Sequence, residues 1–255
     1  MAETIRSCIF CGAGSLTRED AWPLWLMKSL YTNLSGIMEA QQGEKELKPW
    51  RTKDPKLQIK CVCKSCNNGW MSSLEGQAKP TIESLVTTDS ILIDSQAQKI
   101  LSAWSIKNAM VFEEMRPPEQ GRFYQSTERE TFKNGLELPL HTSVWITKRV
   151  NNNDPYCEAY SISGGAIEIT GPVSGYVTTM AFGALAIQVL SIKISTSITQ
   201  YSKVFSEVRP GPWDQATLCI WPIQNKQTLW PPSILLSGEV GLQTFNDRWK
   251  PMKLD

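Results

Sequence analysis

The chain has 255 residues, of which 41% are hydrophobic and 20% charged, a composition typical of a soluble globular protein with a substantial core. Lysine and arginine total 26 against 25 acidic residues, which excludes a chain-wide basic field, so any nucleic-acid binding needs a local patch. The seven cysteines are an odd number and the N-terminus has no apolar leader, so we expect a reducing, cytoplasmic location. The uncharged run over residues 177–192 is shorter than the roughly 20 apolar residues of a membrane span, and no membrane partner is expected.

Three helical patterns come first along the chain. Helical spacing predicts a helix over residues 19–34, with Pro23 near its start, where a missing N–H costs nothing. A second helix is predicted over residues 66–86, with an interruption near Pro80. A third is predicted over residues 95–115, with apolar side chains on one face.

The chain changes character near residues 86–95 and becomes richer in β-branched residues and turns. We expect strands over residues 142–150, 157–163, 165–171 and 217–223, and a last helix over 237–249. The run over 177–192 is either a pair of buried strands or a core helix. Trp-Pro pairs at Trp221 and Trp230 either line a groove where bases stack or seal a β core. The pattern predicts an α+β protein with a small module over residues 1–90 and a larger α+β domain over 91–255, whose role stays open.

Four cysteines have the spacing of a metal site. Cys8 and Cys11 form one Cys-x2-Cys turn, and Cys63 and Cys66 form a second. Each turn directs two thiolates to one point, and two such turns supply the tetrahedral four-sulfur shell of structural zinc sites. A single Cys-x2-Cys is also a redox motif, but two pairs favour zinc. The zinc would be a clamp, because a closed four-sulfur shell has no open position for water.

Cys61 is an alternative ligand in the second turn, since the strand-like alternation before it lets Cys61 and Cys63 point the same way. Cys63 is preferred, because the Cys-x2-Cys spacing gives the tight turn that zinc sites use. Cys157 and Cys219 lie in predicted strands and are expected to be small buried side chains.

The stretches "CIFCG", "LTREDAWPLWL" and "CVCKSCNNGWMSSLE" together resemble the HNH endonucleases, the zinc-stapled ββα-metal nucleases. The resemblance covers roughly residues 8 to 75. It implies a treble-clef-like ββα module holding structural zinc, with a divalent ion bound beside it for hydrolysis of DNA phosphodiesters. Members of the family occur in phage defence and restriction.

The resemblance assigns roles to individual residues. Glu19 falls at the acidic metal-ligand position, Pro23 at the motif's proline, and Asn67 at the ligand position where the helix begins. Glu75 lies close to the acid that often ends the motif's helix. Taken without the resemblance, Glu19 and Asp20 also suit a helix start, and Asn67 suits a helix N-cap.

Asp20 is the departure from the family, because it stands where the family has its general-base histidine. The chain's single histidine, His141, lies far from the motif. An aspartate with an ordinary pKa of ~4 is a poor base near neutral pH, but it is a good ligand for Mg²⁺ or Mn²⁺. Glu19, Asp20 and Asn67 are therefore the expected catalytic residues and ligands of Mg²⁺ or Mn²⁺. The substitution either retunes the site or silences it.

A basic stretch lies between the two cysteine pairs and is the candidate DNA-binding patch: Lys48, Arg51, Lys53, Lys56, Lys60 and Lys64. There are two interpretations of this stretch: its positive charges neutralise DNA phosphates, or it is a solvated loop without a binding role. The sequence therefore predicts a metal-dependent HNH-like endonuclease acting on DNA. The alternative is an inactive HNH-like module that binds DNA or a protein partner, and a homodimer or protein partner on the C-terminal domain stays open.

Overall fold

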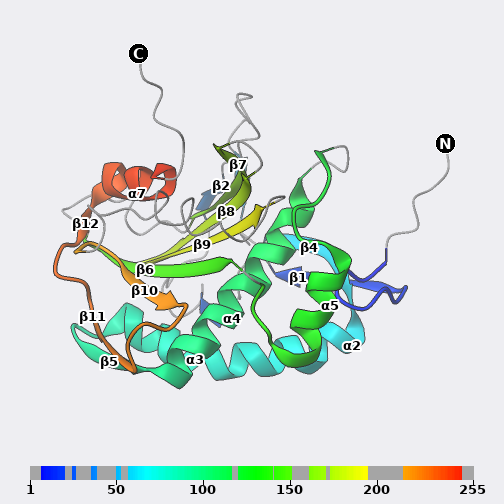
Figure 1. Cartoon of the computed structure of the whole chain (residues 1–255), viewed down its shortest axis with the longest axis horizontal. Helices are drawn as coiled ribbons and strands as arrows, with labels where there is room; N and C mark the ends of the chain where they lie inside the picture. Colours follow the sequence, from blue (N-terminus) through cyan, green and yellow to red (C-terminus); the bar gives the residue numbers. More distant parts are fainter. Residues whose placement is uncertain are drawn as a thin grey trace, which may run out of the picture.

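The structure is a computed structural model, and it describes residues 7–20, 25–26, 36–38, 50–52, 57–116, 120–139, 141–150, 161–170, 173–194 and 215–248. This part of the chain contains both helices and a mainly antiparallel sheet, so the predicted α+β class is confirmed. Figure 1 shows that the long helix α4 lies under the sheet, between it and α3, while α7 lies on the opposite side of the sheet.

The N-terminal part is built on a pair of antiparallel strands. β1 (Leu16–Asp20) pairs with β4 (Gln58–Cys63) from Leu16↔Cys63 to Asp20↔Gln58. A shorter pair, β2 (Gly36–Met38) with β3 (Trp50–Thr52), lies between them in the chain. The helix predicted over 19–34 is wrong at its start, because Glu19 and Asp20 are paired with β4. Residues 25–26 are helical, and the rest of that predicted helix lies outside the described residues.

The helical region after β4 begins with α2 (Lys64–Cys66) and the π-helical turn η1 (Asn67–Met71), followed by α3 (Ser72–Thr87). Buried residues at helical spacing give α3 its inner face: Leu74, Ala78, Ile82 and Leu85. The interruption predicted near Pro80 is wrong. Pro80 is exposed and removes one backbone hydrogen bond, but burial of the inner face holds the helix continuous through it.

Helix α4 (Ser95–Phe112) is the central element of the fold, and it confirms the third predicted helix. It follows strand β5 (Ile91–Asp94), and the Asp94 carboxylate caps it by accepting the Ala97 N–H at 2.8 Å. Every residue from Leu101 to Val111 is buried, since α3 covers one side and the sheet the other. A 3-10 turn, η2 (Glu113–Met115), ends the segment.

The sheet has the strand order β10-β6-β9-β8-β7, and β12 pairs in parallel with β6. Its strands are β6 (Thr142–Val150), β7 (Ser161–Thr170), β8 (Val173–Phe182), β9 (Leu185–Ile194), β10 (Leu218–Trp221) and β12 (Leu236–Ser237). β6 has the predicted bounds, and residues 177–192 form a strand pair rather than a helix. Gly183, with φ of 53°, makes the β8–β9 turn, a conformation that favours glycine. The two strands predicted over 157–163 and 165–171 are a single strand, β7, where the structure describes them.

Three smaller elements complete the described part. They are α5 (Ser126–Gly135), β11 (Gln227–Trp230), which pairs with β5, and α7 (Gly238–Asp247), which confirms the last predicted helix. Of the two Trp-Pro tryptophans, Trp230 is buried and Trp221 is half-buried against the core, so both pack on the core rather than line an open groove. Both Trp-Pro bonds, Trp221–Pro222 and Trp230–Pro231, are cis.

One buried apolar cluster extends from Cys8 and Phe10 through α3 and α4 to the sheet. The cluster contains residues from both sides of residue 90, and the domain boundary at residue 90 stays a prediction. A second, smaller cluster between the sheet and α7 contains Ala181, Ala186, Leu236 and Phe245. Among the described helices, none combines the length and apolar character that crossing a membrane requires.

Candidate zinc centre and adjoining acidic site

Two tight turns present the cysteines. In the first, the Gly12 N–H donates to the Cys8 carbonyl at 2.8 Å, and the Cys8 N–H donates to the Ala13 carbonyl at 2.7 Å. Gly12 has φ of 70°, which allows the chain to turn back with little strain. In the second, Cys63 ends β4, and its sulfur accepts the backbone N–H of Cys66 at 3.4 Å. Each turn therefore holds its two cysteines on the same side.

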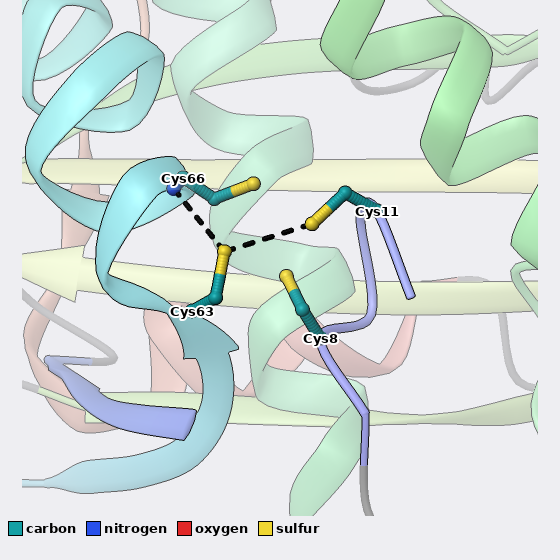
Figure 2. Close-up of side chains that lie close together, drawn as sticks. All are labelled: Cys8, Cys11, Cys63 and Cys66. Atoms are coloured by element: carbon teal, nitrogen blue, oxygen red, sulfur yellow. Dashed lines mark hydrogen bonds between the residues drawn. The ribbon is translucent and has the colours of Figure 1, made fainter. Parts of the chain in front are cut away.

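The four predicted ligands meet at one point. The sulfur atoms of Cys8, Cys11, Cys63 and Cys66 all lie within 4.8 Å of one another (Figure 2). The Cys11 and Cys63 sulfurs are 3.6 Å apart, whereas a tetrahedral ion with Zn–S bonds of about 2.3 Å separates its sulfurs by about 3.8 Å. All four are free thiols rather than disulfides. The cluster can therefore hold a metal ion, and its all-sulfur ligand set fits structural zinc.

Position, rather than protonation, separates the ligands from Cys61, because burial also raises the pKa of the ligand Cys66. The N–H of Cys66 stabilises the Cys63 thiolate and lowers the pKa of Cys63 to about 7. Burial raises the pKa of Cys61 to about 12, and Cys61 lies outside the four-sulfur cluster. The preference for Cys63 over Cys61 is thus confirmed. Cys219 lies in β10 and is half-buried, while Cys157 falls outside the described residues.

The cysteine cluster is braced by aromatic side chains. Trp70, in the turn after Cys66, meets Phe10 of the first cysteine turn edge to face, with ring centroids 4.9 Å apart. The same indole meets Phe132 of α5 at 5.8 Å. These rings join both turns to α5, so loss of the metal is expected to loosen packing beyond the cysteines themselves.

Glu19 lies inside the protein rather than at its surface. It is 7% exposed, and one carboxylate oxygen, Oε1, accepts a hydrogen bond from the Lys107 ammonium at 2.9 Å. Lys107 belongs to α4, and its side chain is 1% exposed. The predicted metal ligand therefore already has a cationic partner from outside the segment that resembles the nuclease family.

Asp20 and Asn67 lie apart from that ion pair. Asp20 follows Glu19 on β1, so its side chain points to the other face of the strand, where its Oδ1 accepts a hydrogen bond from Gln58 at 2.8 Å. The Asn67 amide donates to the Thr17 hydroxyl at 3.2 Å and to the Arg18 carbonyl at 3.0 Å. Asn67 thus ties the start of the helical region to β1.

Glu75, on α3, belongs to the same acidic region. Its Oε1 accepts a hydrogen bond from the Trp25 indole at 2.8 Å. Burial raises the pKa of Glu75, the nearby charge of Lys107 opposes that shift, and the charges of Glu19 and Asp20 add to it. Glu75 therefore shares one electrostatic environment with both predicted carboxylates, and we call Glu19, Asp20 and Glu75 together the acidic site.

The acidic site is not assembled as a ligand set. Within the described residues, the four cysteines are the one group of at least three cysteine, histidine or acidic side chains whose ligand atoms lie close enough to share an ion. Glu19, Asp20 and Asn67 lie on neighbouring elements but point in different directions.

The basic patch is described only in part. Lys60, on β4, and Lys64, in α2, are exposed. Arg51 lies in β3, and its side chain is outside the described part. The remaining members, Lys48, Lys53 and Lys56, also lie outside the described residues.

His141 stands immediately before β6, with φ of 61°, and burial lowers its pKa. Its carbonyl accepts the Ile192 N–H at 3.1 Å, which places its backbone beside β9. His141 therefore lies at the large sheet rather than on β1 or α3, the elements that carry the acidic site.

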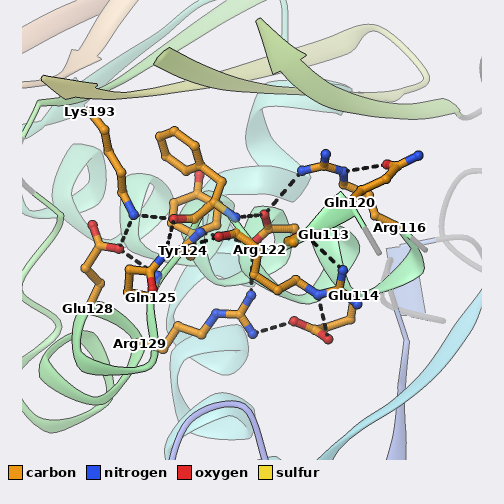
Figure 3. Close-up of polar contacts among 12 residues, drawn as sticks. Glu113, Glu114, Arg116, Gln120, Arg122, Tyr124, Gln125, Glu128, Arg129 and Lys193 are labelled. Carbon is orange, nitrogen blue, oxygen red and sulfur yellow. Dashed lines mark hydrogen bonds and ion pairs between the residues drawn. The ribbon is translucent and has the colours of Figure 1, made fainter. Parts of the chain in front are cut away.

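An ion network between η2 and α5 was not predicted (Figure 3). The Glu113 carboxylate is fully buried and accepts hydrogen bonds from the Tyr124 N–H at 3.2 Å and from Arg129 at 2.9 Å. Arg129 also donates to Glu114 at 2.6 Å, and Arg122 pairs with Glu114 at 3.2 Å. The network joins η2 to α5, and its central pair, Glu113 and Arg129, is buried.

Sequence reasoning missed Lys107, whose position in a buried helix indicates an ionic partner but does not identify it. Lys107 lies on a helix segment whose residues from Leu101 to Val111 are all buried, and a buried lysine requires a partner. No spacing rule connects residue 107 with residue 19, so the partner became identifiable only in the fold.

Comparison with known proteins returned no match: no family model, no curated protein and no solved structure is similar to the chain.

Proposed function

We propose that the chain is a metal-dependent nuclease that hydrolyses DNA phosphodiester bonds at the acidic site. The observation that carries the proposal is the grouping of three carboxylates, Glu19, Asp20 and Glu75, along a strand pair and helix that the cysteine cluster clamps together. Two of these carboxylates lie at the end of β1 remote from the cysteines, since Leu16 pairs with Cys63 and Asp20 with Gln58. The metal clamp and the reacting groups would thus occupy opposite ends of one unit.

The donor chemistry of the acidic site fits Mg²⁺ or Mn²⁺. Hard divalent ions prefer carboxylate oxygens, and the site offers three carboxylates with Lys107 as a single buried ammonium beside them. Glu19 and Glu75 would hold the ion, because Asp20 lies on the opposite face of β1, and an ion bound there would lower the pKa of water and neutralise phosphate charge. Asn67 is better suited to holding β1 against the helix start, because its amide hydrogens are used there.

The chain's own residues would perform the remaining tasks. Asp20 stands where the resembling family has its base, and Gln58 orients it through the 2.8 Å hydrogen bond. Lys60 and Lys64 are exposed on the second strand and the second cysteine turn, where they would contact phosphates of the substrate. Each phosphate contact adds about 0.9 to the slope of log affinity against log salt, so replacing either lysine by glutamine should reduce that slope by about this amount.

The test is nicking of supercoiled plasmid with Mg²⁺, with Mn²⁺ and with EDTA. The wild type should cut with either metal and not with EDTA, and Asp20→Ala should abolish cutting. Asn67→Ala should reduce cutting through loosening of β1. If wild-type protein loaded with zinc leaves supercoiled, linear and single-stranded DNA intact with both metals, the proposal is wrong.

A second function is favoured by two observations. Glu19 already has a buried cationic partner, and the position of the family's histidine is occupied by Asp20. A site of this kind suits a nuclease-like module that binds DNA or a protein partner without cutting. Gel shifts that detect salt-sensitive DNA binding by a protein that never cuts would support this alternative, and absence of any nucleic-acid binding would remove its DNA version.

A further inference from the structure

The outer face of the β1–β4 pair carries two cations directly opposite each other. Arg18 of β1 pairs with Lys60 of β4, and both residues are exposed. Directly opposed residues of an antiparallel pair point to the same face, with Cβ atoms about 4.5–5.5 Å apart, and like charges in this position destabilise the pair. Strand pairing by itself therefore does not favour this arrangement.

A β-bulge creates the arrangement. The register shifts between Thr17 and Arg18, because β4 contains one extra residue, Cys61, at this point. Continuation of the register at Thr17 would place Glu19 opposite Lys60, which is a pair of opposite charges. The bulge instead places Arg18 there, and bulges commonly redirect side chains next to functional sites.

Side-chain hydrogen bonds hold the bulge in place. The Thr17 hydroxyl donates to the Val62 carbonyl at 3.0 Å. The Asn67 amide donates to the Thr17 hydroxyl at 3.2 Å and to the Arg18 carbonyl at 3.0 Å, so it contacts the chain on both sides of the shift. The backbone that carries Arg18 is therefore fixed opposite Lys60.

Neither cation is neutralised by the protein. Among the described residues, no acidic side chain forms an ion pair with Arg18 or Lys60. The acid on the same face of β1 is Asp20, which lies opposite Gln58 and accepts a hydrogen bond from its amide at 2.8 Å. Glu19 is buried on the other face. The two positive charges thus face solvent together, where one anion can reach both.

We propose that Arg18 and Lys60 together bind one phosphate of the DNA backbone. This inference rests on the proposed function for the identity of the anion. A guanidinium donates two parallel hydrogen bonds to phosphate oxygens, and an ammonium adds a point charge, so a phosphate between them replaces repulsion by attraction. Two residues along a strand span about 7 Å, so the bound phosphate would lie beside Asp20.

The first experiment measures binding of a fluorescently labelled DNA duplex by anisotropy, between about 50 and 200 mM salt. It uses zinc-loaded full-length protein without added Mg²⁺ or Mn²⁺, so that no DNA is cut. The variants are Arg18→Gln, Lys60→Gln and the double variant. Lys99→Gln is the matched control, because Lys99 is an exposed lysine of α4 and the change removes the same charge.

The slope of log affinity against log salt distinguishes one shared phosphate from two. A single exposed ion pair contributes little, so removing either cation should release the phosphate. We expect both single variants and the double variant each to reduce the slope by about 0.9, and Lys99→Gln to match the wild type. A reduction of about 1.8 in the double variant, or an unchanged slope in Arg18→Gln, would overturn the inference.

The second experiment tests the opposition of the two charges without DNA. Lys60→Glu converts the pair to opposite charges, so it should raise Tm at about 0.01 M salt, and the gain should disappear at about 1 M salt. The same change in the Arg18→Gln background should give no such gain. A gain of equal size in both backgrounds, or no gain in either, would show that the side chains do not interact and would overturn the inference.

The outcomes separate the two proposals. A wild type that cuts plasmid while Arg18→Gln and Lys60→Gln bind DNA as it does would overturn the inference and leave the proposed function standing. A wild type that never cuts but loses the expected slope in these variants would overturn the proposed hydrolysis and support the inference. A wild type that binds no DNA would overturn the inference.

Discussion

Replacing Cys11 by serine tests the zinc centre at its most accessible ligand. Cys11 is the exposed member of the cluster, so the substitution removes a thiolate without creating a hole in the core. Its sulfur lies 3.6 Å from that of Cys63, within the four-sulfur group, and a neutral hydroxyl at this position cannot complete the tetrahedron. We therefore expect Cys11→Ser to lose the metal.

The magnitude follows from what the ion contributes to folding. Structural zinc sites contribute apparent binding free energies of about 10–16 kcal/mol, against a total stability of about 5–15 kcal/mol for a typical domain. Losing even a third of the former would remove roughly 3–5 kcal/mol, enough to unfold much of the region around the cysteine turns. The loss should spread to Trp70, which packs on Phe10 and Phe132.

The assay is zinc content after dialysis, measured together with tryptophan fluorescence. Cys61→Ser is the matched control, because Cys61 is buried two residues before Cys63 but outside the cluster. We expect one zinc per chain in the wild type and in Cys61→Ser, with little zinc and altered tryptophan emission in Cys11→Ser. Full zinc content in Cys11→Ser, or its loss in Cys61→Ser, would refute the assignment of ligands.

Three further predictions concern stability. Glu113→Gln should lower the free energy of unfolding by roughly 3–5 kcal/mol in urea titrations, because it leaves the buried Arg129 guanidinium without its full counter-charge; a change below about 1 kcal/mol would contradict this. Pro80→Ala should raise that free energy by about 2 kcal/mol, because alanine restores the hydrogen bond to the Gly76 carbonyl; a lower Tm would show that Pro80 has a packing role. Burial lowers the pKa of His141 from 6.5, so the unfolded chain binds the proton more readily, and stability should fall as pH decreases below about 6.5. His141→Asn tolerates the φ of 61° and should flatten this pH dependence; an unchanged slope would assign it to other groups.

The parts of the fold that the sequence predicted are those set by local periodicity. The run over 142–150 alternates in the manner of a strand and forms β6, and the apolar spacing over 95–115 forms α4 and its terminal turn. The cysteine cluster was also predictable, because paired Cys-x2-Cys turns have one dominant use.

The errors have a common cause, which is tertiary contact overriding a local preference. Glu19 and Asp20 match a helix start, yet pairing with Ile59 and Gln58 of β4 places them in a strand. Pro80 matches a break, yet the buried face of α3 holds the helix together.

The relative positions of the side chains in the acidic site could not be predicted from the sequence, for a geometric reason. Adjacent residues on a strand point to opposite faces, so a strand at Glu19 and Asp20 separates two side chains that the predicted helix would have left nearer each other. The contact of Lys107 with Glu19 spans 88 residues and depends on how α4 packs, which no local pattern specifies.

The most direct test of the nuclease proposal compares Glu75→Gln with Glu83→Gln in metal-dependent plasmid nicking. Both glutamates lie on α3, but Glu75 belongs to the acidic site while Glu83 pairs with Lys79 at the surface. The proposal predicts that Glu75→Gln retains zinc and fold but loses Mg²⁺- and Mn²⁺-dependent cutting, and that Glu83→Gln cuts as the wild type does. Equal cutting by both variants, or no cutting by the wild type, would contradict it.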